Sequence, residues 1–386
     1  MRNDKRVTGN DAIIVKSIQE FLCTNKPKLD ELLCRYKTFT PKDFIITAKN
    51  EEFINTNIDV LILTATPIET FTLLDEMSKH KKPIQELISE RGRSYHIGKL
   101  GEYNVVHIQS TMGTDAYATA LMAINKWNPK LIISLGIAYG NIIDKHKLGD
   151  IIFPTLILPP IDGKISNGEL YFNINTWAPN TEDYIRNLMN DIASFYSQQN
   201  KFSINIGSII SCPFVISDPK FKKMLFNSVK HFRAIGGEME SYDIYKAVYE
   251  AEKTLGKKYC FMLKGISDWA ESKNCSSDDE QDSIQLFAVN NALSVLLELM
   301  SNDEYFKPIG IFSHKNRMAI DDIKWQLQQY SNLVNQVKDT KQNLQQILML
   351  HDTNDCREFL DNLKVYGFCD NNHNLTDKGV LLLYSL

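Results

Sequence analysis

Between residues 58 and 300 the chain alternates short apolar runs with stretches of helical spacing, and this alternation constrains the fold more than any other feature. Residues 58–66 (IDVLILTAT) and 130–137 (KLIISLGI) are apolar runs that end in turn residues, the pattern of parallel strands buried on both faces. Helical segments lie between such runs. The pattern predicts an α/β fold, a three-layer sandwich with a mixed, largely parallel central sheet.

The composition changes on both sides of this core, which predicts three regions. Residues 1–57 combine a helical pattern with a charged link through Pro27 and Pro41, and we interpret them as a helical accessory segment. Residues 58–302 form the central domain. Residues 303–386 are rich in Gln, Asn and Lys at helical spacing. They are interpreted as a small, mainly helical or winged-helix-like interaction module, because no basic residues cluster on a helix there.

Charge and cysteine usage exclude several classes of protein. The net charge of -4 gives no basic excess, so nucleic acid is not an expected partner. No apolar run approaches the roughly 20 residues of a membrane helix. The 7 cysteines are scattered without a CxxC pair, which suits the reducing cytoplasm. His107, His146 and His231 lack ligand spacing, so we expect no metal and no cofactor.

Acidic residues flank a predicted helix and strand in residues 236–268 (GGEMES to KGISD). Glu238 and Glu240 precede the helix, and Asp268 follows the strand. Ligands gather outside the carboxyl ends of strands in open α/β sheets, so Asp268 is a candidate for chemistry. Each acid also has a structural interpretation: first-turn acids favour the helix dipole, and an aspartate after a strand often holds a turn.

A fourth acid, Glu69, follows the first predicted strand. In TPIE, Thr66 is a candidate N-cap, Pro67 fits the first helical position and Glu69 falls three residues after the cap. This spacing predicts a capping box, which alone contributes ~1 kcal/mol and no chemistry.

Several motifs in this order resemble the signature segments of the nucleoside phosphorylase and nucleosidase superfamily, over roughly residues 58–300. They are TATPIE, SLGIAYG followed by LGDIIFP, SCPFVISD, GGEMES and KGISD. The resemblance implies cleavage of the N-ribosidic bond between a sugar and a purine, in the branch of methylthioadenosine/S-adenosylhomocysteine nucleosidases or of nucleotide nucleosidases.

The resemblance also assigns roles. Asp268 would be the general acid at the purine N7, with Ser267 orienting it, and Glu69 would activate water. Glu240 would accept the ribose hydroxyls beside Met239, and Phe214 would stack on the base. The implied catalytic residues are therefore Glu69 and Asp268, and the implied substrate contacts are Glu240, Met239, Glu238, Phe214, Ser267 and Gly136.

The attacking nucleophile separates the two branches of the family. Phosphorylases similar to this chain hold phosphate with arginines at two places, the first strand–helix turn and the SLG motif. Here TATPIE at the first turn has no arginine, and Ser134 stands at the second place. We therefore favour hydrolysis by water, with phosphorolysis as the alternative. Ile137 and Lys264 depart from the family pattern and leave the exact nucleoside open.

A basic cluster suggests a nucleotide substrate such as AMP or ATP. Arg91, Arg93 and Lys99, together with His96, are candidate contacts for a 5′-phosphate, although basic clusters are more often solvated surface. Similar domains fused to extra modules act as nucleotide-depleting effectors in bacterial defence. We further expect a homo-oligomer and a regulatory protein or signal acting through the C-terminal module. A non-catalytic sensor or scaffold is the third hypothesis.

Overall fold

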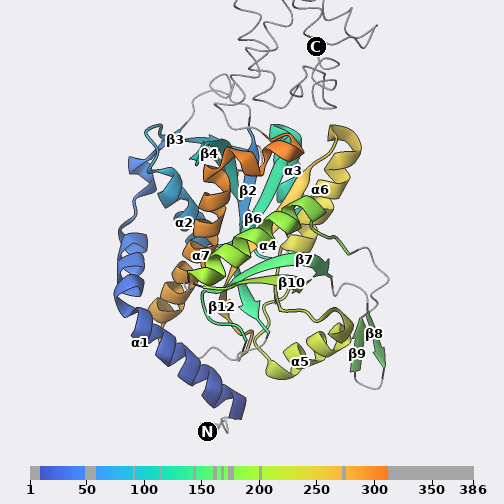
Figure 1. Cartoon of the computed structure of the whole chain (residues 1–386). Coiled ribbons are helices and arrows are strands. Elements are labelled where there is room, and N and C mark those ends of the chain that lie inside the picture. The colour runs from blue at the N-terminus through green and yellow to red at the C-terminus, as the bar shows by residue number, and fades with distance from the viewer. Residues whose placement is uncertain are drawn as a thin grey trace, which may run out of the picture. The chain divides into compact units, whose positions relative to one another are not determined.

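A computed structural model describes residues 9–47, 58–89, 92–113, 115–141, 145–159, 163–166, 169–172, 178–199, 202–271 and 275–311. The predicted C-terminal module lies outside these residues from position 312 onward, and so does Arg91. Residues 1–311 fall in one compact unit (Figure 1). The fold is mixed α/β, with a central sheet between helices.

The described residues form a sheet of 10 strands in the order β1-β3-β4-β5-β2-β6-β11-β10-β7-β12. β12 also pairs with β6, so β6, β11, β10, β7 and β12 close into a ring. Neighbouring strands pair in both parallel and antiparallel directions. The strands are β1 (Ile45–Thr47), β2 (Val60–Thr64), β3 (Ile84–Ile88), β4 (Ser94–Leu100), β5 (Tyr103–Gln109), β6 (Leu131–Gly140), β7 (Ile151–Leu158), β10 (Ile204–Ser211), β11 (Gly236–Glu238) and β12 (Tyr259–Asp268).

A separate two-stranded sheet corrects one expectation. The segment 159–176, with its prolines and glycines, suggests a loop, yet β8 (Gly163–Ser166) and β9 (Glu169–Phe172) pair antiparallel within it.

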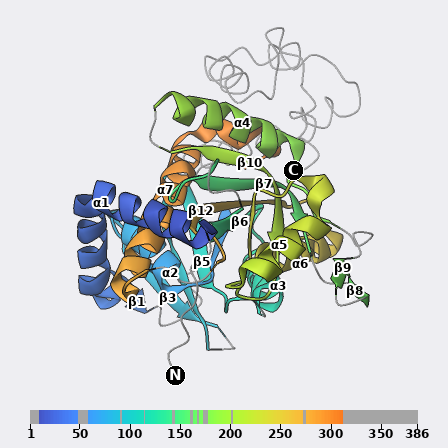
Figure 2. The ribbon, with the colours of Figure 1, turned by 90° about the horizontal axis from the view of Figure 1, so that it is seen from below.

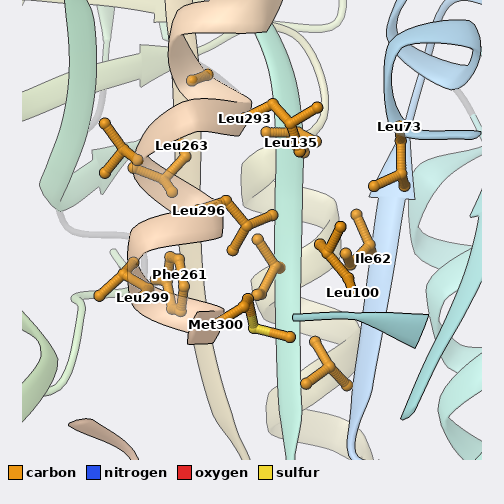
Figure 3. Packing of buried hydrophobic residues seen from close by; sticks show 14 of the residues in the cluster. Ile62, Leu73, Leu100, Leu135, Phe261, Leu263, Leu293, Leu296, Leu299 and Met300 are labelled. Carbon is orange, nitrogen blue, oxygen red and sulfur yellow. The ribbon is translucent and has the colours of Figure 1, made fainter. Parts of the chain in front are cut away.

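Two hydrophobic clusters lie on opposite faces of the sheet. Successive residues of a strand point to opposite faces; in β2, Val60 and Ile62 belong to one cluster and Leu61 and Leu63 to the other. Burying each such side chain stabilises the fold by roughly 1.5–3 kcal/mol. Figure 3 shows the first cluster, where leucines of one long helix meet the strands at Leu135 and Leu263.

Helices cover both faces (Figures 1 and 2). Buried residues of α3 and α6 belong to the second cluster, and those of α2 and α4 to the first. The helices are α1 (Gly9–Thr38), α2 (Pro67–Met77), α3 (Ala116–Trp127), α4 (Asp183–Gln198), α5 (Pro219–Ser228), α6 (Ser241–Leu255) and α7 (Asp278–Ser301), with short 3-10 turns at Pro41–Asp43, Lys230–Phe232, Asp303–Tyr305 and Lys307–Ile309.

Helix α7 is the one described helix that is long and apolar enough to cross a membrane, but it serves as a core helix. Of its most apolar window, 67% is buried inside the protein. Its leucines pack on β6 and β12 within the first cluster (Figure 3).

The N-terminal helix α1 runs further than the sequence suggests. Pro27 lies inside it rather than in a link after it. A proline inside a helix removes one backbone hydrogen bond and kinks the axis, and α1 bends along its length (Figure 2). Its packing on α7 keeps the chain helical through this position: the rings of Phe21 and Phe287 meet edge to face at 5.0 Å, and Lys37 pairs with Asp279 at 2.6 Å.

Candidate active site

Glu69 is held at the start of α2 by its own backbone surroundings. The predicted capping box is present: the Thr66 hydroxyl accepts from the Glu69 N–H at 3.3 Å, and the Thr66 N–H donates to Glu69 Oε2 at 3.0 Å. The Ala65 N–H donates to the same oxygen at 2.6 Å. The other oxygen, Oε1, accepts from the Ile137 N–H at 2.8 Å and so joins α2 to β6. The structural interpretation of Glu69 is therefore correct, and it fixes the carboxylate at one place.

Gly136 makes room for this carboxylate. A Cβ atom at position 136 would lie 2.0 Å from Glu69 Oε1, which no side chain tolerates. The resemblance implied a substrate contact at Gly136; the group that approaches Gly136 in the structure is the carboxylate of Glu69.

Lys264 lies beside Gly136 in the neighbouring strand β12, and its side chain is 1% exposed. Its ammonium is 3.4 Å from Glu240 Oε2 and 3.9 Å from Glu69 Oε1. Burial alone would lower the pKa of Lys264, but Glu69 and Glu240 outweigh burial, so the pKa lies above its ordinary value. The side chain is a buried cation between two carboxylates.

Glu240 follows β11 and is 5% exposed. Burial is the main reason why its pKa rises from 4.5 to about 7; Glu238 and Glu69 add to the rise, and Lys264 opposes it. Glu238 has a different use: its carboxylate accepts the backbone N–H groups of Glu240 and Ser241, both at 2.9 Å, and thereby caps the start of α6. We call Glu69, Glu238, Glu240 and Lys264 the acid–lysine cluster.

Asp268 ends the same strand that carries Lys264. The pairing of β12 with β6 is irregular between Ile266 and Asp268, and such bulges re-aim side chains beside active sites. The Ser267 hydroxyl lies 3.0 Å from Asp268 Oδ2, and the Ala270 N–H donates to Oδ1 at 2.8 Å. Asp268 is exposed, whereas Ser267 is buried. The Ala270 contact agrees with the turn interpretation of Asp268, and Ser267 lies within hydrogen-bond distance of the carboxylate.

A cavity of about 130 Å³ lies beside Asp268. This volume far exceeds the roughly 10–15 Å³ that one water requires, so the cavity can take part of a ligand. We call it the Asp268 pocket. Its lining comes from α1, from the segment before α5, from the end of β12 and from α7: Ile14, Ile18, Val215, Ile216, Ser217, Ser267, Asp268, Trp269, Glu271, Cys275, Gln281, Ile284 and Gln285.

Two sites of opposite character thus lie along one strand: a buried cluster of acids around Lys264 and an open pocket at Asp268. A comparison with families of known proteins matches residues 59–300 to the phosphorylase superfamily. The chain belongs to this superfamily. The match confirms the resemblance carried by the sequence motifs and covers more than half of the chain.

Solved structures of the superfamily have the same fold at low sequence identity. A 5′-methylthioadenosine/S-adenosylhomocysteine nucleosidase from Neisseria meningitidis, bound to methylthio-immucillin-A, has a TM-score of 0.51 and 17% identity, covering 63% of this chain and 98% of its own. The S-adenosylhomocysteine nucleosidase from Streptococcus pyogenes, bound to 5-methylthiotubericidin, has a TM-score of 0.52 and 16% identity, covering 64% and 97%. Futalosine hydrolase of Helicobacter pylori has a TM-score of 0.50 and 17% identity, covering 63% and 97%.

These neighbours are nucleosidases and a hydrolase, and at this low identity their likeness shows the fold of the chain. No protein in the curated comparison matches the chain.

Phe214 is not in the wall of the Asp268 pocket. Its side chain is 64% exposed, and the next two residues, Val215 and Ile216, line the pocket instead. Met239 is half-buried; a Cβ at Gly113 would lie 3.0 Å from its methyl group, so Met239 faces the segment after β5.

The basic cluster read from the sequence is not formed by Arg93 and Lys99. Arg93 directly precedes β4 and Lys99 lies near its end, so six residues of extended chain separate their backbones by roughly 20 Å. Arg93 donates to the Gln109 carbonyl at 2.9 Å and pairs with Asp115. It therefore stabilises the segment between β5 and α3, which Met239 faces. Lys99 pairs in register with Asn104, near the turn at the far end.

Sequence reasoning missed two contributions to the candidate site. Lys264 was noted as a departure from the family pattern but was given no role. A lysine inside the apolar run YCFMLKGIS cannot stay buried without partners, and this signal points to nearby acids. Ile14 and Ile18 were placed in an accessory segment, and no local signal connects them to a pocket near Asp268.

Proposed function

We propose that the protein is a purine nucleosidase that hydrolyses the N-ribosidic bond of an adenine nucleoside or nucleotide. One observation carries the proposal: Lys264 and Asp268 lie on the same strand, and the carboxylates of Glu69 and Glu240 both lie close to the Lys264 ammonium. This arrangement offers a sugar site and a base site a few residues apart, as an N-ribosidic bond requires.

The carboxylates divide the work of bond cleavage. As the C–N bond breaks, the sugar gains oxocarbenium character and the base gains electron density. Asp268, oriented by Ser267, donates a proton to the purine N7 and lets the base leave. Glu240 in its ionised form accepts hydrogen bonds from the ribose hydroxyls. Glu69 takes a proton from the attacking water, whose oxygen forms the new bond to the sugar carbon.

Charge favours water over phosphate as the nucleophile. A phosphate requires cationic clamps. In the acid–lysine cluster the cation, Lys264, is already opposed by Glu69, Glu240 and Glu238, so the cluster carries no net positive charge. A dianion placed there meets like charge, whereas neutral water does not.

The test is to incubate the full chain with adenosine, methylthioadenosine, AMP and ATP, with and without phosphate, and to follow the free base by chromatography. Adenine release that does not depend on phosphate is expected. Release that requires phosphate would replace hydrolysis by phosphorolysis, and no release from any substrate by a folded protein would leave a binding function.

Finer features belong to the same proposal. The match to nucleosidases supports a small-molecule purine nucleoside. Arg93 pairs with Asp115, two residues after the Gly113 that Met239 approaches, and this supports a contact to a 5′ group and so a nucleotide. Stacking by Phe214 requires the segment before α5 to close over the base.

The two clusters on opposite faces of the sheet support a three-layer sandwich. We also propose a cytoplasmic homo-oligomer, regulated through residues 303–386, in bacterial defence.

A further inference from the structure

The N-terminal helix lies outside the residues that match the superfamily, yet it reaches the candidate site. The superfamily match begins at residue 59, and α1 ends at Thr38. Ile14 and Ile18 of α1 nevertheless line the Asp268 pocket together with Ser267 and Asp268. Residues four apart lie on one face of a helix, so a single face of α1 borders the pocket.

The pocket face of α1 is buried, whereas the residue just before Ile14 is exposed. Ile14 is 1% exposed and Ile18 is 8% exposed, and both pack in the same cluster as Trp269 and Ile284. Ile13 is 51% exposed. The contrast between neighbouring isoleucines marks the pocket face of α1 and provides a control position of identical chemistry.

The second half of α1 holds the helix in place. Leu29 and Leu32 are buried, and Arg35 pairs with Asp75 of α2 at 2.5 Å. Lys28 lies 4.6 Å from the ring centre of Phe287 on α7. The helix is therefore anchored on α2 and α7 beyond Pro27, while its first half lies along the pocket.

The walls of the pocket fit a flat ring with apolar faces and a polar edge. Ile14, Ile18 and Ile216 supply apolar contact, and Asp268 supplies a polar group. Gln281 and Gln285, one turn apart on α7, add amides that each carry a hydrogen-bond donor and an acceptor. A purine base has this combination of faces and edge.

We propose that α1 completes the base pocket within the same chain, with Ile14 and Ile18 forming the wall that sets which bases fit. The inference rests on the proposed function, because it takes the ligand of this pocket to be the base that leaves the substrate. A larger side chain at position 14 fills the space for the base, and a smaller one admits a base that carries an added substituent.

Binding of free adenine to the full chain tests the pocket without catalysis. Calorimetric titration of the wild type, Ile14→Trp and the control Ile13→Trp is expected to show about tenfold weaker binding for Ile14→Trp alone. Equal affinities in the three proteins, or no adenine binding by the folded wild type, would overturn the inference. If circular dichroism shows that Ile14→Trp is unfolded, Ile18→Val takes its place, with about threefold weaker binding expected for the loss of one methylene from the wall.

Substrate preference provides a second readout that a merely structural helix would not change. In Ile14→Ala the ratio of kcat/KM for N6-benzyladenosine to that for adenosine is expected to rise about tenfold. An equal loss on both substrates contradicts the inference while leaving hydrolysis intact. Conversely, if the wild type binds adenine but releases no base from any nucleoside, the proposed hydrolysis is refuted and the inference about the pocket still stands.

Discussion

The acid–lysine cluster and the Asp268 pocket sit on the same strand but are built differently. In the cluster, Glu69, Glu240 and Lys264 are buried and bind one another or backbone N–H groups. In the pocket, Asp268 is exposed and an apolar cavity lies beside it. A buried charged cluster fixes geometry before a ligand arrives, whereas an open pocket can adjust to it. Positions in the cluster should therefore couple activity to stability, whereas the exposed Asp268 should affect activity with little effect on stability.

The largest expected effect is on stability, at Lys264. Lys264→Met removes the cation between two buried carboxylates, and breaking a buried pair in this way costs about 3–5 kcal/mol. Urea unfolding measures the loss. Lys257→Met is the matched control, because Lys257 pairs with Glu182 and is 54% exposed; its loss should stay below about 1 kcal/mol. Equal losses in the two variants would show that the cluster does not depend on its cation.

At Asp268 the prediction is reversed, with a large effect on rate and a small one on stability. Asp268→Asn should slow base release by roughly 10² or more, because an amide cannot donate the proton. The fold should be retained, since an amide oxygen still accepts from the Ala270 N–H. Asp218→Asn is the control, an exposed aspartate that likewise accepts backbone N–H groups. A rate unchanged by Asp268→Asn argues against a general acid at this position.

The same contrast explains what the sequence could predict. Glu69, Glu240 and Asp268 follow strands in motifs with local signals, such as the capping box at Thr66, and the structure gathers Glu69 and Glu240 on Lys264. The strand–helix alternation likewise predicted most elements of the central domain. Contacts set by tertiary packing were not predictable: α1 continues through Pro27 because α7 supports it, and Ile14 reaches Asp268 from over 200 residues away in the chain.

The separation of Arg93 and Lys99 was unpredictable for a similar reason. Arg93 and Lys99 are close in sequence, but an extended strand places them far apart, and only the strand assignment with its register reveals this. Sequence proximity predicts spatial proximity within a turn or a helix, not along β4.

The pH dependence of Glu240 sharpens the description of the cluster. Its pKa is raised to about 7, so below pH 7 the group is mostly protonated and cannot accept both ribose hydroxyls. We expect kcat/KM to rise with pH through about 7, and Glu240→Gln to remove this limb while lowering the rate. Persistence of the limb in Glu240→Gln would assign it to another group.

Stability should show the opposite trend. Between pH 4.5 and about 7 the folded protein binds more protons at Glu240 than the unfolded chain does. Glu240 therefore contributes a loss of stability as pH rises through this window. The difference between wild type and Glu240→Gln in urea unfolding, at pH 5 and at pH 8, measures it; a difference that does not change with pH contradicts a raised pKa.

The smallest effect is expected at Phe214, which lies next to the pocket residue Val215 in the chain. Its side chain is 64% exposed, so Phe214→Ala should change the free energy of unfolding by less than about 0.5 kcal/mol. If the ring closes on the base, KM should rise roughly fivefold, corresponding to about 1 kcal/mol of stacking. Phe195→Ala on α4, where the ring is 51% exposed, is the control and should leave KM unchanged. An unchanged KM in Phe214→Ala would mean that the base is held by the preformed walls, with Val215 and Ile216 in place of the ring, and the pocket would then be as preorganised as the cluster.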